Sequence, residues 1–435
     1  MTICHLPLAE PCTRWLPGAG RTLLRFAIPF FYPVSGPFGL SLLSLFLEFC
    51  MLLPILLLSA AGFTVLTTEF IIVGLLPSIA RDLQVSVSQA GLLVTLFAFT
   101  VAAFGPFLTA YFARFPRKKL FISVLVMFGL ANTLAALAPN IWVMSLARLV
   151  PALGLPVFWA LASETAVDIV GPDYAGRAIA KIGFGIVCAT VFGIPVGTLI
   201  ADAFGWRSAF GILAVVAFAK ALLLFIYLPQ TRQHNEQVSL RAQFRILRSP
   251  LMQGHVLLSI LVFSGMFTAY TYLADILERL AGFDGALVGW CLMGFGAVGL
   301  IGNSLGGRAV DRHPLIASMV FCALMIGGMV ALVPSIHSTL GLAAAMAIWG
   351  VTQAAMFLVS HVRLIKAAPQ APAFAASLNI AGANLGIGLG AMVGGRVIDT
   401  LGLGSLGFAA SGFILLSIAL ALLLMKLKAP SACAS

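Results

Sequence analysis

The chain has 435 residues, of which 61% are hydrophobic and 9% are charged, whereas soluble domains are about half apolar and a quarter charged. This composition indicates an integral membrane protein of helices, because the apolar runs are continuous and a membrane barrel would alternate apolar and polar residues along ~10-residue strands. The net charge of +11 does not indicate nucleic-acid binding, since the basic residues are spread among loops, and the seven scattered cysteines indicate neither a disulfide framework nor a metal site.

The first fifty residues differ from the rest of the chain. The segment from Leu23 to Cys50 is apolar, but Pro29, Pro33 and Pro37 interrupt it and make it a poor membrane span. It could be a signal-like or re-entrant segment. Alternatively, translation begins at Met51, which we favour because a thirteenth crossing would oppose the orientation that the loop charges indicate.

Twelve long apolar segments follow, each long enough for the roughly 20 residues that a membrane crossing needs. They lie near 52–77, 87–112, 119–138, 141–166, 178–202, 208–229, 251–274, 286–309, 315–334, 338–362, 375–399 and 406–426. We expect residues 1–50 to be an atypical extension, 51–229 and 251–428 to be two six-helix bundles, 230–250 a cytoplasmic linker, and 429–435 a tail.

The distribution of Lys and Arg predicts the orientation of these spans. The loops after even-numbered spans, together with the C-terminal tail, hold sixteen basic residues, whereas the loops after odd-numbered spans hold four: Arg81, Arg207, Arg279 and Arg396. We therefore expect a multi-pass protein of a bacterial-type cytoplasmic (inner) membrane, with the linker and both ends of the twelve-span unit in the cytoplasm.

The two halves contain an internal repeat. The segment FGIPVGTLIADAFG (192–205) aligns without gaps on LGAMVGGRVIDTLG (389–402), 197 residues further on. In this alignment Asp202 meets Asp399, and span five corresponds to span eleven. Paired halves of this kind are typical of carriers that work by alternating access, in which one bundle rocks against the other around a central site.

Several motifs resemble those of the major facilitator superfamily, and within it the drug and sugar efflux antiporters that exchange solute for protons. They are TEF (68–70), RFPRKK (114–119), Arg148 with Gly154, GIPVG (193–197) and GRAVDR (307–312). The resemblance covers about Met51 to Lys428. It implies an all-α transmembrane protein with the twelve-helix major-facilitator fold of two pseudo-symmetric six-helix bundles.

The resemblance also implies an inner gate at the loops after spans two and eight. The family's loop has a glycine, an acid and a second glycine where this chain has Thr109, Ala113 and Pro116, so the first-half latch lacks its carboxylate. The alternative is that these basic residues fix topology alone. The residues expected at the gate are Arg114, Arg117, Lys118, Glu164, Asp311 and Arg312.

Spans five and eleven carry glycine stripes. Glycines 382, 386, 390 and 394 recur every four residues, and Gly193 to Gly197 forms a GxxxG motif with Pro195 inside it. Small residues at this spacing let helix backbones approach closely in lipid. For Gly193, Pro195, Gly197, Gly390 and Gly394, pure packing is as good an interpretation as the antiporter motif that the resemblance implies.

Glu69 is the one charged residue between Met51 and Arg81, in the middle of the first span. Its neighbours on the same helix face are Val65, Ile72 and Val73, so its partner must come from another span. Counting 1.5 Å per residue places Glu69 and Arg148 at matching depth, roughly 10 Å inside the outer boundary. Burial disfavours a charged carboxylate and a guanidinium favours it, so we expect Glu69 with Arg148 to bind and release the coupled proton. A permanently ionised structural pair is the alternative.

The substrate cavity is less well marked by the sequence. Polar and aromatic residues of the central spans could hydrogen-bond or stack on a ligand, although interhelical bonding is the simpler role for each one. Lys220 in span six is expected to reach towards the membrane surface. The cavity residues that we expect are Thr68, Trp159, Tyr270, Gln353 and Asn384.

Together these features predict a secondary active transporter, not an enzyme, that exports a drug, sugar or similar metabolite by proton antiport. No GxxxxGK[ST] phosphate loop of an ATP-driven pump occurs in the sequence. We expect no cofactor beyond the proton gradient, and a monomer whose partners are a small-molecule substrate, protons and the lipid bilayer. The alternatives are a proton-independent facilitator or uptake carrier of the same fold, and a ligand-binding membrane sensor or membrane enzyme.

Overall fold

The computed structural model describes residues 37–112, 114–170, 175–230, 249–369 and 372–428. These residues form helices and contain no strand, as expected where lipid offers backbone groups no hydrogen-bond partner. Twelve of the helical segments are long and apolar enough to cross a membrane. The predicted linker (230–250) and tail lie almost wholly outside the described residues.

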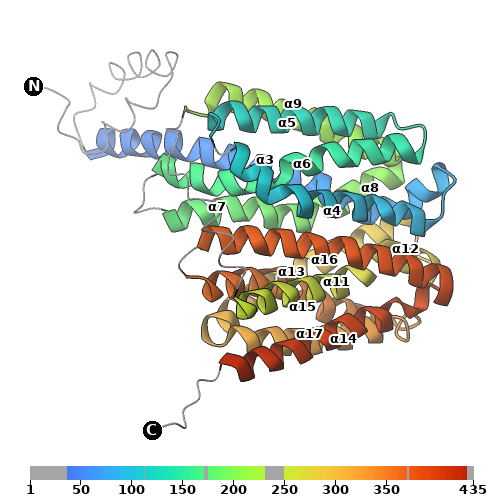
Figure 1. Cartoon of the computed structure of the whole chain (residues 1–435). Helices are drawn as coiled ribbons and strands as arrows, with labels where there is room; N and C mark the ends of the chain where they lie inside the picture. Colours follow the sequence, from blue (N-terminus) through green and yellow to red (C-terminus); the bar gives the residue numbers. More distant parts are fainter. Residues whose placement is uncertain (1–36, 113, 171–174, 231–248, 370–371, 429–435) are drawn as a thin grey trace, which may run out of the picture.

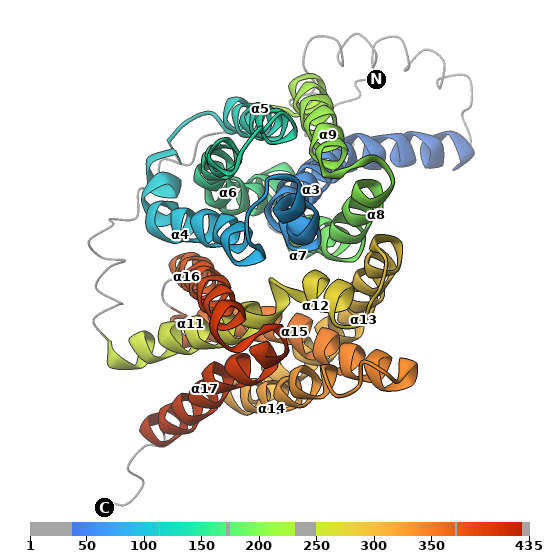
Figure 2. The same ribbon diagram turned by 90° about the vertical axis from the view of Figure 1, so that its right-hand side faces the viewer.

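The first six spans form one group of helices (Figures 1 and 2). Span five contains a π-helical turn between α7 and α8, just before Pro195, whose missing N–H cannot complete a regular α-helical ladder. The helices are α3 (Pro37–Asp82), α4 (Val87–Phe112), α5 (Arg117–Ala136), α6 (Ile141–Val170), α7 (Ala175–Cys188), η3 (Ala189–Gly193), α8 (Ile194–Phe204) and α9 (Trp206–Tyr227).

The last six spans form the second group, which packs beside the first (Figure 2). Span seven is interrupted between α11 and α12, at Thr271 and Tyr272. The helices are α11 (Pro250–Tyr270), α12 (Leu273–Arg279), α13 (Gly285–Arg312), α14 (Pro314–Leu332), α15 (Thr339–Ala367), α16 (Pro372–Leu401), the 3₁₀ turn η4 (Leu403–Ser405) and α17 (Leu406–Lys428).

Helix α3 is longer than the first predicted span at both ends. It runs from Pro37 to Asp82, so the helix continues through Met51 instead of starting there. Residues 1–36 of the predicted extension lie outside the described residues, and the start of translation at Met51 stays a prediction. At its other end α3 brings Arg81 and Asp82 to the end of the bundle that the loop charges predict to be outside the cell. We call this the outer end.

Local signals in the sequence explain several helix starts. Helices α11, α14 and α16 each begin at a proline, whose fixed φ and missing N–H suit the first helical position. At the start of α4, Ser86 and Gln89 form a reciprocal capping box, with both hydrogen bonds at 3.0 Å. The Asp284 carboxylate caps α13 by accepting a hydrogen bond from the Leu287 amide at 2.7 Å.

The glycine stripes make equivalent helix contacts within each of the two halves. A Cβ on Gly193 would collide with Thr67 of span one, and a Cβ on Gly390 would collide with the Ser264 carbonyl of span seven. Both the glycines and their partners are separated by 197 residues, the repeat offset found in the sequence. The repeat therefore extends from the sequence to the helix contacts, and Gly193 and Gly390 pack closely against spans one and seven.

The buried apolar side chains divide into three clusters. The largest, which we call the shared core, contains side chains of both halves, including Phe70, Leu76, Phe267 and Leu292, and reaches the outer end. The other two lie towards the opposite end. One consists of side chains of the N-terminal half, with Ile380 packed against it, and the other of side chains of the C-terminal half. The halves are thus joined by a common core at the outer end.

Candidate functional site

Glu69 and Arg148 lie together inside the N-terminal half. The Arg148 side chain, from α6, is 1% exposed and donates to the main-chain carbonyl oxygens of Thr68 and Glu69 on α3, the latter at 2.6 Å. This contact agrees with the matching depth predicted from the sequence. The guanidinium also lies over the Phe97 ring, 4.5 Å from its centroid, so a cation–π interaction supports the same position.

The predicted ion pair is not made. Among the described residues, no carboxylate oxygen lies within 4.0 Å of the Arg148 guanidinium. Two carbonyl dipoles of α3 accept its hydrogen bonds instead. Glu69 is 7% exposed, and its oxygens are not among the sealed, unpartnered side-chain atoms of the described chain. The two charges are near enough for a Coulombic attraction.

A buried amide that the prediction did not include, Asn132 of α5, contacts the turn of α3 around Glu69. The Asn132 amide of α5 donates to the Thr68 hydroxyl at 3.0 Å, which makes Thr68 an interhelical contact. The signal for Asn132 in the sequence is weak, because it is a single polar residue in an apolar span. The tendency of buried amides in membranes to join helices is the rule that indicates such a contact.

Tyr270 and Gln353 belong to an aromatic cluster in the C-terminal half. Tyr270 stacks on Phe295 at 5.4 Å between ring centroids, and Trp349 packs edge-on against both rings. The Trp349 indole N–H donates to the Gln353 carbonyl oxygen at 2.9 Å. That bond orients the amide, and the two predicted residues both lie in this buried cluster.

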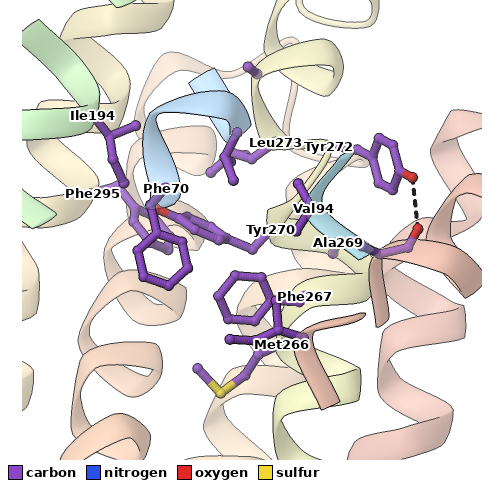
Figure 3. Close-up of a cluster of buried hydrophobic side chains, with 14 of the residues drawn as sticks. Phe70, Val94, Ile194, Met266, Phe267, Ala269, Tyr270, Tyr272, Leu273 and Phe295 are labelled. Carbon is purple, nitrogen blue, oxygen red and sulfur yellow. Dashed lines mark hydrogen bonds between the residues drawn. The ribbon is translucent and has the colours of Figure 1, made fainter. Parts of the chain in front are cut away.

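One aromatic contact links this cluster to the turn that holds Glu69. Phe70 lies 5.8 Å from Phe267, measured between ring centroids, and Phe267 lies 5.5 Å from Tyr270 (Figure 3). Phe70 follows Glu69 directly in α3. The carboxylate of the N-terminal half and the aromatic cluster of the C-terminal half therefore lie on adjoining elements where the two halves meet.

The other two predicted cavity residues lie apart from this junction. Half-buried Trp159 packs on α3 at Gly62, about two turns from Glu69, and contacts Phe158 edge-on at 5.5 Å. The Asn384 amide donates to the Ile380 carbonyl at 3.1 Å within its own helix, while its carbonyl oxygen is sealed without a partner.

Two ion pairs that involve predicted latch residues each lie within one half. The Arg117 guanidinium, 3% exposed, pairs with the Glu164 carboxylate at 2.8 Å, which joins α5 to α6. In the second half Lys366 of α15 pairs with Asp311 of α13 at 3.2 Å.

The remaining three latch residues are placed at the surface of their own halves. Arg114 is exposed and covers the Tyr111 ring at 4.0 Å, and Lys118 lies 5.7 Å from the Phe225 ring. Arg312 is exposed at the end of α13.

The Lys220 side chain does not point in the predicted direction. Instead of reaching towards the membrane surface, its ammonium turns to α3, donating to the Ala60 carbonyl and to the Thr64 hydroxyl at 2.6 Å. It also lies 5.1 Å from the Phe63 ring. The acceptors of a neighbouring helix thus hold the charge inside the bundle, which a single-span view of the sequence could not reveal.

Arg363, which directly follows the predicted tenth span (338–362) and is one of the sixteen basic residues assigned there to loops, does not lie in a loop. It lies in α15, is 1% exposed, and donates to the His255 ring nitrogen Nδ1 at 2.7 Å and to the Ser259 hydroxyl at 2.8 Å, both on α11. The helix continues further than the hydropathy suggested, and this buried guanidinium joins spans ten and seven.

Comparisons with known proteins give the family. The family model described as Major Facilitator Superfamily matches residues 58–371. The chain is 31% identical over 373 residues to the "Inner membrane transport protein YdhP" of Escherichia coli O157:H7, which covers 86% of this chain and 95% of that protein. It is 30% identical over 364 residues to a "Probable sugar efflux transporter" of Pasteurella multocida (strain Pm70), covering 83% and 90%.

The fold is that of a solved transporter. A bacterial homologue of the human lysosomal transporter Spinster, in an inward-facing, unoccupied conformation, superposes with a TM-score of 0.71 and 18% identity, over 87% of this chain and 97% of that chain. The twelve apolar helices, the two related halves and the extensive sequence match agree. The chain belongs to the major facilitator superfamily, a family of membrane transporters and not of enzymes.

Proposed function

We propose that this protein exports a small molecule, most simply a sugar or a similar polar metabolite, in exchange for protons, and that Glu69 carries the proton. The observation on which the proposal rests is that Glu69 is buried at membrane depth and close to Arg148, yet makes no ion pair with it. The next residue in α3, Phe70, contacts Phe267 of the other half. Ionisable groups are costly at such depth, by ~2.5 to 3.5 kcal/mol on insertion scales, so they are usually functional.

The contacts of Glu69 and Arg148 are enough to link protonation to a movement of helices. When Glu69 is ionised, its charge attracts Arg148, and when it binds a proton this attraction is lost while the carbonyl contacts of the guanidinium remain. Protonation of Glu69 therefore weakens the attraction that holds α3 and α6 together. One proton entering across 100 mV releases about 2.3 kcal/mol, enough for roughly a 50-fold gradient of a neutral solute.

The aromatic cluster supports a ring-shaped polar solute. Tyr270, Phe295 and Trp349 provide ring faces, while the Tyr270 hydroxyl and the Gln353 amide can hydrogen-bond to hydroxyl groups. The similarity to a protein named as a probable sugar efflux transporter points to the same class. Drugs with planar rings suit the aromatic faces too, so the substrate panel has to contain both.

The proposal is tested by efflux from cells that produce the protein. The cells are preloaded with each member of a panel of radiolabelled sugars and drugs, and solute loss is followed with and without an uncoupler. We expect faster loss of at least one solute than in the host strain, continuing against its gradient, and an uncoupler should abolish the uphill part. Faster loss that proceeds downhill only, and that the uncoupler leaves unchanged, would contradict antiport and identify a facilitator.

A further inference from the structure

An ion pair at the outer end joins the two halves at equivalent positions. Arg81, at the end of α3, pairs with Glu278 of α12, and the two residues are separated by 197 residues, the offset of the internal repeat. Residues at the same offset occupy corresponding places in the two halves. A direct contact between two such residues must lie on the pseudo-two-fold axis that relates the halves, because the axis is where corresponding positions meet.

Two further contacts flank this pair and obey the same symmetry. The Ser88 hydroxyl, in the first turn of α4, donates to the Asp399 carboxylate near the end of α16 at 2.9 Å. At the matching place in the other half, the Asp202 carboxylate near the end of α8 lies against Gly285, the first residue of α13, so closely that a Cβ would not fit. Each carboxylate thus meets the N-terminal turn of a helix of the opposite half, where the helix dipole favours negative charge.

Beneath the ion pair the two halves are closed. A small cavity of about 50 Å³ lies there, with Leu75, Thr198 and Ala274 among the residues that line it. Leu75 has no exposed surface and belongs to the shared core. A reagent at the outer end can therefore reach Leu75 only if the contacts above it separate.

We propose that Arg81 and Glu278, flanked by Ser88 with Asp399 and by Asp202 with Gly285, form the outer gate of the transport cycle. The axial ion pair stabilises the state that is closed at this end, and it must break when the halves rock to open it. The inference rests on transport by two rocking halves and on the orientation expected from the loop charges. It does not depend on proton coupling or on the direction of export.

The gate can act although its charges are partly exposed. The Arg81 side chain is 61% exposed and the Glu278 side chain 26%, and such pairs contribute little to overall stability. Two conformations of a transporter need differ by only a few kcal/mol, however, so a small change in one contact alters their populations. Reversing one charge replaces an attraction with a repulsion, and we expect about a fivefold shift towards the open outer end.

The test uses Leu75→Cys as a reporter in a variant that lacks the native cysteines. A membrane-impermeant maleimide is added to right-side-out and, separately, to inverted vesicles, and the labelling rate is measured. We expect Arg81→Glu and Glu278→Arg each to raise the rate about fivefold in right-side-out vesicles. The double variant Arg81→Glu/Glu278→Arg restores the pair with its charges exchanged, so its rate should return to within twofold of the reporter alone.

The neighbouring residue Asp82 provides a matched control. Its carboxylate pairs with Arg207 of α9 at the same end, but within the N-terminal half, so Asp82→Asn should leave the labelling rate unchanged. Membrane yield and gel-filtration profile show that each variant is folded, and Arg81→Gln replaces any reversal that fails this check. The gate is refuted if the single reversals match Asp82→Asn, or if the exchanged pair labels as fast as they do. A rise confined to inverted vesicles would also refute the proposal, because the gate would then lie on the cytoplasmic side.

Discussion

At the scale of single residues, the protein holds several cations inside its bundles with neutral partners. Arg148 and Lys220 both donate to main-chain carbonyls of α3, and Arg363 donates to a histidine nitrogen and a serine hydroxyl. Carbonyl oxygens have a spare lone pair even within a helix, so they can accept a bond from a neighbouring span. The sequence predicted that Arg148 would reach Glu69, but it suggested a carboxylate as the acceptor because main-chain acceptors leave no mark in a sequence.

The two hydrogen bonds of Arg148 lead to a prediction for Arg148→Lys. A guanidinium can reach the Thr68 and Glu69 carbonyls together, whereas a single ammonium on a shorter stem cannot reproduce that fork. Losing one charge-assisted bond costs about 1.5 to 3 kcal/mol. We expect at least a tenfold lower efflux rate with near-normal membrane yield, measured with the solute identified by the efflux panel. A rate within twofold of the wild type would show that positive charge alone is sufficient there.

At the scale of helices, continuous hydropathy predicted all twelve spans, and the bounds of α4 agree with the prediction at both ends. The differences occur where tertiary contacts extend or interrupt a helix. α3 continues to Asp82, whose carboxylate bonds to Arg207 and to the Trp206 indole, so the outer turn is stabilised by a neighbouring helix. The break after Tyr270 and the π-helical turn before Pro195 depend on packing between spans, which hydropathy does not record.

The glycine stripe of α16 leads to a prediction at this scale. A Cβ at Gly390 would lie 2.9 Å from the Thr268 amide nitrogen and closer still to the Ser264 carbonyl, so α11 and α16 would have to move apart. We expect Gly390→Ala to destabilise the purified protein by about 1 to 3 kcal/mol through overpacking. The measurement is the midpoint of thermal unfolding, which should be lower than in the wild type.

Gly412 of α17 is the matched control for that change. A Cβ there meets nothing within 4 Å, so Gly412→Ala should be neutral or slightly stabilising, since alanine favours a helix over glycine by roughly 0.5 to 1 kcal/mol. If both variants unfold at the wild-type temperature, the close contact of α11 with α16 is not limiting and the stripe has another role.

At the scale of the whole molecule, two related halves share a core at the outer end and keep separate cores towards the other end. The repeat that the sequence reveals at 192–205 and 389–402 also predicts which contacts correspond, such as Gly193 with Thr67 and Gly390 with Ser264. The sequence could not predict which end is closed, because both ends must close in turn during transport and one sequence encodes both arrangements.

The central claim is that the Glu69 carboxylate couples the solute gradient to the proton gradient. The most direct measurement compares Glu69→Gln with the wild type in inverted vesicles, where an exporter concentrates solute inside. Glutamine imitates the protonated carboxyl and cannot release a proton. We predict that Glu69→Gln loses uphill accumulation driven by a proton gradient but still exchanges labelled for unlabelled solute in counterflow, while Glu69→Asp retains part of the accumulation. A Glu69→Gln variant that concentrates solute as well as the wild type would contradict the account.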